Sequence, residues 1–131
     1  MISTELRAAL EQPWMRAYCR ALALAYAYGV LVHLWHMTGL ASGGWDTIPL
    51  VWLAADVVYA PLDMAVVFGL WRRHGWGIVM FLLVAISQIV VYGVFAGLFE
   101  VGAAEAQGLR VMIVFHLVTL ALFFWIWRSR I

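Results

Sequence analysis

Four long apolar runs dominate this sequence, and each is long enough to cross a lipid bilayer as a helix. They cover about residues 14–40, 48–71, 76–99 and 109–127. A helix rises about 1.5 Å per residue, so roughly 20 apolar residues cross the hydrocarbon core. The runs are too long and too continuous for the alternating strands of a membrane barrel. The sequence therefore predicts an all-α polytopic membrane protein built as a four-helix up-and-down bundle.

Little chain is left outside these runs, so residues 1–131 are expected to form a single membrane domain. Residues 1–13 carry Leu6, Ala9 and Leu10 at helical spacing before Pro13. This pattern predicts a short interfacial helix that lies along the membrane surface until Pro13 redirects the chain. Later in the chain, Gly93 and Gly97 form a small-xxx-small pattern, which allows close helix approach either inside the bundle or between subunits.

The positive charges predict the orientation of the bundle, because Arg and Lys in short loops favour the cytoplasmic side. The chain has eight Arg and no Lys. Arg110 falls on one side of the predicted bundle, and the remaining arginines fall on the other: Arg7, Arg16, Arg20, Arg72, Arg73, Arg128 and Arg130. Both termini are therefore expected to be cytoplasmic.

Each apolar run carries a polar residue about one third of the way in from the same predicted face: His33, Asp56, Tyr92 and His116. An ionisable group in hydrocarbon costs several kcal/mol unless it faces the bundle interior, water or a partner. The spacing therefore predicts one shared polar site. Alternatively, these residues have a purely structural role and hold the bundle together through hydrogen bonds between helices.

Polar residues share helix faces in the second and third runs. Asp56, Tyr59 and Asp63 lie on one face of the second run, and Gln88 and Tyr92 on one face of the third. A buried carboxyl can exchange a proton near neutrality. One hypothesis is therefore an acid–base or binding site for an apolar small molecule. Its candidate acid–base residues are Asp56, His33 and His116, and its candidate ligand-binding residues are Tyr59, Asp63, Gln88 and Tyr92.

The histidines suggest two further hypotheses. His33, His36, Asp56 and His116 are imidazole and carboxylate donors suited to a Zn, Cu or Fe ion. A histidine of the first run together with His116 would instead suit the axial positions of haem b. Cys19 is the single cysteine, so neither an internal disulfide nor a zinc–thiolate site can form within one chain.

Several stretches resemble known membrane proteins. They are WDTIPLVW at residues 45–52, PLDMAVVFGLW at 61–71, VVYG at 90–93 and VFHL at 114–117. Together they resemble small uncharacterised four-helix inner-membrane proteins of proteobacteria, which implies location and fold but no reaction. More faintly, Arg20 with His33, and Asp56 shortly before Pro61, are similar to the sterol-isomerase and sigma-2-receptor group, which implies an acidic membrane pocket for a cationic or sterol-like ligand.

The size, the short loops and the absence of a soluble domain favour one function above the others. We expect a non-catalytic accessory or interaction subunit of a larger membrane assembly, partnered by the bilayer and by a membrane protein or a second copy. The sequence has no basic stripe for nucleic acid. The alternatives are the membrane-embedded ligand or acid–base site and the metal- or haem-binding redox subunit described above.

Overall fold

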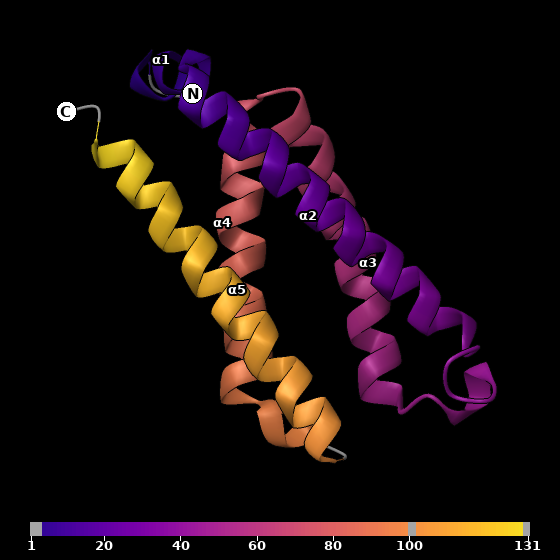
Figure 1. Ribbon diagram of the computed structural model, residues 1–131. Coiled ribbons are helices and arrows are strands. Elements are labelled where there is room, and N and C mark those ends of the chain that lie inside the picture. Colours follow the sequence, from indigo (N-terminus) through magenta and orange to yellow (C-terminus); the bar gives the residue numbers. More distant parts are fainter. Residues whose placement is uncertain (1–3, 100–101, 130–131) are drawn as a thin grey trace.

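The computed structural model describes residues 4–99 and 102–129, and over these residues the protein is helical without strands (Figure 1). Five α-helices follow one another: α1 (Thr4–Glu11), α2 (Pro13–Thr38), α3 (Leu50–Trp71), α4 (Gly75–Ile89) and α5 (Ala103–Arg128). Four segments are long and apolar enough to cross a membrane, namely α2, α3, α5 and α4 continued to Val94. The prediction of an all-α chain with four apolar helices of spanning length is therefore confirmed.

The four long helices run alternately up and down (Figure 1). The helix α1, the turn between α3 and α4 and the last turn of α5 lie at one end of the bundle, which we call the α1 end. The connections between α2 and α3 and between α4 and α5 lie at the opposite end. This is the up-and-down order predicted from the short loops.

The helix ends differ from the predicted spans. The helix α2 ends at Thr38, because Gly39 adopts a left-handed φ of 69° and donates its N–H to His36 O at 3.0 Å. The third span leaves α-helical geometry at Ile89 and continues as the π-helical turn η2 (Val90–Val94). The fourth helix begins at Ala103 rather than at residue 109. Its first residues include Ala, Glu and Gln, which favour helix even where the chain is polar.

The N-terminal segment forms the short helix that the sequence predicts, within the described part that begins at Thr4. Ala9 and Leu10 are buried, and α1 packs on α2 and α4. The sequence predicts that Leu6, Ala9 and Leu10 lie along the membrane surface, and this remains a prediction. The structure shows that Ala9 and Leu10 anchor α1 to the bundle. Residues 1–3 lie outside the described residues.

A tight apolar core fills the α1 end of the bundle. Its fully buried side chains come from three helices and include Met15, Cys19, Val66, Leu70 and Phe81. The backbones of α3 and α4 cross closely here, because a methyl group on Gly69 would overlap Gly77 Cα and one on Gly77 would overlap Gly69 C.

The bundle does not pack closely at Gly93 and Gly97. A Cβ on Gly93 would meet Ile113 Cδ1 at 3.6 Å, an ordinary contact, and one on Gly97 would meet nothing within 4 Å.

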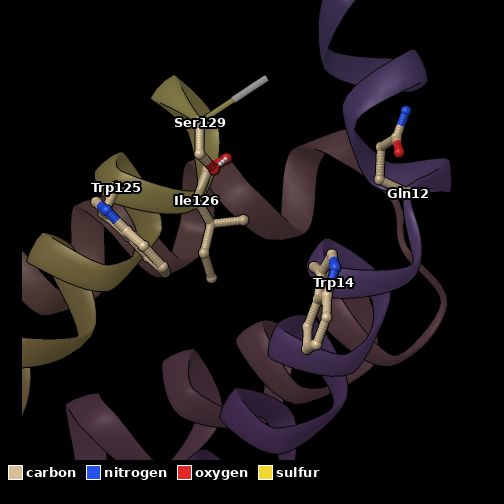
Figure 2. Close-up of a pocket in the computed structure, with 5 residues that line it drawn as sticks. All are labelled: Gln12, Trp14, Trp125, Ile126 and Ser129. Carbon is tan, nitrogen blue, oxygen red and sulfur yellow. Dashed lines mark hydrogen bonds between the residues drawn. The ribbon is translucent and has the colours of Figure 1, made fainter. Parts of the chain in front are cut away.

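The side of the bundle between α2 and α5 is sparsely packed. The helix α2 lies along α3, and α3 along α4, whereas α2 and α5 touch at few points. Near the α1 end the two helices flank a hollow of about 570 Å³. Figure 2 shows the side chains that line it: Gln12, Trp14, Trp125, Ile126 and Ser129. We call this side of the bundle the α2–α5 seam.

Candidate functional site

A histidine on α2 lies between two carboxylates of α3. His33 Nδ1 lies 2.7 Å from Asp56 Oδ1, and His33 Nε2 lies 3.3 Å from Asp63 Oδ2. Asp56 and Asp63 are seven residues apart, which is two helical turns and therefore one face of α3. Gly29 makes the approach possible, since a Cβ there would already lie 3.3 Å from Asp63 Oδ2. Each ring nitrogen of His33 thus contacts a carboxylate oxygen of α3.

Asp56 has a second histidine beside it. His36 Nδ1 lies 3.4 Å from Asp56 Oδ2, and the His36 side chain is 44% exposed. The separation falls within an ion pair but the geometry makes no hydrogen bond, so Asp56 Oδ2 is a buried oxygen with no hydrogen-bond partner among the described residues. Buried oxygens without a hydrogen-bond donor are rare in native proteins, because their burial is costly.

A second series of hydrogen bonds continues from Asp63 to α4 and α5. Gln88 Nε2 donates to Asp63 Oδ1 at 3.2 Å, and His116 Nε2 lies 2.6 Å from Gln88 Oε1. The amide oxygen only accepts, so His116 Nε2 carries the proton in this assignment. His116 Nδ1 is then the acceptor for the Tyr26 hydroxyl, which lies 3.4 Å away. His116 is therefore held in one tautomer from both sides.

These contacts join side chains from all four spanning helices into one polar network. Its members, in order, are His36, Asp56, His33, Asp63, Gln88, His116 and Tyr26. Asp56, Asp63, Gln88, His116 and Tyr26 are each less than 5% exposed. The network is thus an internal feature of the bundle, as the cost of charge in hydrocarbon requires.

An aromatic group lies beside the polar network. The Tyr59 ring stacks near His33 at 6.4 Å between centroids, and its hydroxyl donates to Ser87 Oγ at 3.2 Å. Tyr92, which the π-helical turn η2 carries, packs on Tyr59 at 5.8 Å and on Trp52 at 6.1 Å. Tyr59 and Tyr92, both predicted to bind a ligand, therefore lie beside the network, where Tyr59 stacks near His33.

A cavity of about 350 Å³ opens along the α2–α5 seam against the polar network. Five of its lining residues belong to the network: Tyr26, His33, Asp63, Gln88 and His116. Its other walls are mainly apolar or glycine, and they include Gly29, Val32, Gly108, Val111, Met112 and Phe115. The cavity therefore combines an apolar entrance with a polar base. We call it the seam cavity.

The four residues predicted to share one level separate into different contacts. His33 and Asp56 meet, whereas His116 meets Gln88 and Tyr26. The sequence placed His116 at the depth of His33 because it counted from residue 109. The helix α5 begins six residues earlier, so every depth counted along it changes. Two residues that contact the site, Tyr26 and Ser87, have no role in the predictions from the sequence. Tyr26 lies two helical turns from His33, a spacing that marks it as a candidate, whereas Ser87 gave no such signal.

The four residues predicted to ligate a metal ion do not all meet in the structure. Among residues 4–99 and 102–129, no three His, Cys, Asp or Glu side chains are arranged to hold a metal ion. His116 is separated from the Asp56 group, and the ring nitrogens of His33 and His116 all contact protein side chains. The geometry favours hydrogen bonding over ligation at these histidines.

Comparison with known proteins identifies the family but not a reaction. No curated protein and no solved structure matches the chain. A family model described as a family of unknown function, DUF6163, matches residues 13–130, which include every residue of the polar network and of the seam cavity. The chain therefore belongs to the DUF6163 family.

Proposed function

We propose that this protein is a membrane-embedded binding protein for a small amphipathic molecule. The polar end of that molecule lies against the polar network, and its apolar part lies between α2 and α5. The seam cavity carries the proposal, because it joins apolar walls to five polar side chains that converge on one base. Small-molecule sites in proteins typically have this form, with volumes of about 300–1,000 Å³.

The position of the cavity defines how a ligand reaches it. The sparse contact between α2 and α5 leaves the entrance on the flank of the bundle, where acyl chains surround a spanning helix. Tyr28 and Val111, which line the cavity, are 71% and 64% exposed. A bilayer-soluble ligand therefore enters sideways from the membrane and does not have to cross the polar ends.

The network also defines which polar groups the ligand meets. Asp63, His33, Gln88 and His116 line the cavity, whereas Asp56 does not. In this proposal Asp63 is the carboxyl that faces the ligand, and Asp56 positions His33 through the 2.7 Å contact. The same groups support the acid–base alternative, with His33 and His116 exchanging protons with the bound molecule.

Filling the seam cavity is expected to remove the ligand without disturbing the network. A Cβ on Gly108 would meet nothing within 4 Å, so Gly108→Leu extends into open space on the cavity wall. Because overpacking a filled site costs about 1–3 kcal/mol, we expect about tenfold less bound molecule. Native mass spectrometry of protein released from its own membrane in mild detergent measures this loss.

The matched control for this experiment is Gly97→Leu. Gly97 also has open space around an added Cβ, but it does not line the seam cavity. A small-molecule mass on the wild type that survives in both variants would contradict the assigned site. A stoichiometric protein partner without any small adduct would contradict ligand binding and support the accessory-subunit function instead.

We further propose that both termini face the cytoplasm of a bacterial cell and that the bundle lies in the inner membrane. Six arginines belong to elements at the α1 end, whereas Arg110 lies near the start of α5 at the opposite end, and Arg130 lies outside the described residues. This asymmetry supports the orientation, and the resemblance to proteobacterial inner-membrane proteins supports the location.

A pair of reporters fused after Ile131 tests the orientation. Because the positive loops are retained inside, green fluorescent protein is expected to fluoresce and alkaline phosphatase to stay inactive. The same fusions made in the connection between α2 and α3, after Ser42, should give the reverse pattern. Active phosphatase after Ile131 would contradict the proposed orientation.

A further inference from the structure

Three arginines line one pocket at the α1 end of the bundle, away from the seam cavity. Arg7 comes from α1, and Arg72 and Arg73 come from the turn between α3 and α4. Leu10, Glu11 and Gly75 complete the lining of a pocket of about 260 Å³. We call it the arginine pocket. Segments far apart in the sequence thus bring three arginines to the lining of one pocket.

Both segments that carry these arginines are fixed by the fold. Leu10 is only 5% exposed, so the packing of α1 on the bundle determines where Arg7 lies. Arg73 has a φ of 57°, a left-handed conformation that residues other than glycine seldom adopt. The turn around it is closed by backbone hydrogen bonds from Arg73 N to Leu70 O and from His74 N to Gly69 O.

The three guanidinium groups have unused hydrogen-bonding capacity. Within the described residues, none of them takes part in an ion pair or a side-chain hydrogen bond. Glu11 is the single acid among the residues that line the pocket, so three positive charges face one negative charge. An anion with several acceptor oxygens would balance the remaining charge and satisfy the forked donors.

We propose that the arginine pocket binds the phosphate group of an anionic phospholipid. Arg guanidinium groups match the geometry of phosphate oxygens, and basic pockets at the ends of spanning helices are typical headgroup sites. Trp71 and Trp76 flank the turn and are half exposed, as expected at headgroup level. This site is independent of the proposed ligand in the seam cavity.

Lipid retention by the full-length protein tests the site. The protein is reconstituted in nanodiscs of phosphatidylcholine with or without phosphatidylglycerol and then extracted in mild detergent. Native mass spectrometry measures the mass of the lipid that the protein retains. Each basic side chain near a membrane surface contributes roughly a fivefold gain in affinity, so the variant R7Q/R72Q/R73Q is expected to retain phosphatidylglycerol about a hundredfold more weakly. The variant R110Q/R128Q, which leaves the pocket intact, should retain it as the wild type does.

Inorganic phosphate separates the two sources of this chemistry. Wild-type protein that retains phosphatidylglycerol through the three arginines, and does not release it to millimolar phosphate, supports the proposal. Retention that is equal in both variants, or absent in the wild type, overturns it. Phosphate binding that requires the arginines without any preference for phosphatidylglycerol also overturns the phospholipid assignment. The single variant Arg7→Glu gives the same readout if the triple variant fails to fold.

Discussion

Replacing Gly77 with Ala is expected to lower the free energy of unfolding by about 3 kcal/mol, the upper part of the usual range for overpacking. The added methyl group would overlap the carbonyl carbon and Cα of Gly69 on the facing helix. These are backbone atoms, so the clash cannot be relieved by a side-chain rotation, and α3 and α4 must separate. Unfolding in mixed micelles with increasing dodecyl sulfate, followed by circular dichroism, measures the change.

Gly108→Ala is the matched control for Gly77→Ala. Gly108 lies inside α5 with open space around an added Cβ, so the methyl group only raises helix propensity and should stabilise the protein by about 0.5–1 kcal/mol. The two variants make the same chemical change in a helix and are expected to shift stability in opposite directions. A Gly77→Ala protein as stable as Gly108→Ala would contradict the close crossing of α3 and α4.

The helices of this protein could be predicted because each depends on a local property of the sequence. A run of apolar residues long enough to cross a bilayer is helical wherever it lies in the bundle. The crossing of Gly69 and Gly77 could not be predicted in this way, because its two residues belong to different helices on either side of a turn. The spacing rule for small residues pointed to Gly93 and Gly97 instead, where an added Cβ would make at most an ordinary contact inside the bundle.

The polar network could be predicted as a set of residues but not as a set of partners. His33, Asp56, Asp63, Gln88 and His116 all stand out because a polar group in an apolar run is costly. Which of them meet depends on where each helix begins and how deep it lies. The predicted start of α5 was six residues too late. His116 was therefore predicted at the level of His33, whereas in the structure it lies at the level of Gln88 and Tyr26.

The seam cavity had no signal in the sequence. It exists because α2 and α5 touch at few points, and the separation of two helices is a property of the whole bundle. Its apolar walls, such as Val111 and Met112, read as ordinary lipid-facing or core residues. The cavity changes the interpretation of the network, because five polar side chains face open space as well as one another.

Replacing Asp63 with Leu is expected to cost about 3–5 kcal/mol of stability, as when one partner of a buried charged pair is removed. The change leaves His33 Nε2 and Gln88 Nε2 without the oxygens that now lie 3.3 and 3.2 Å away. Asp63→Asn should cost only about 1 kcal/mol, a typical value for one hydrogen bond between membrane helices. Its oxygen accepts from Gln88, and its amide donates to His33 when that nitrogen carries no proton. Dodecyl sulfate unfolding in mixed micelles measures both variants.

The Asp63 variants also separate a structural role from a binding role. Met64→Leu, on the neighbouring and more exposed position of α3, should leave both stability and bound mass unchanged. If Asp63→Leu is as stable as the wild type, the network does not hold the bundle together. If Asp63→Leu also loses the bound molecule in that case, the result assigns the Asp63 carboxyl to ligand binding. A charged group inside the membrane is costly, and a role in folding would then be excluded as its explanation.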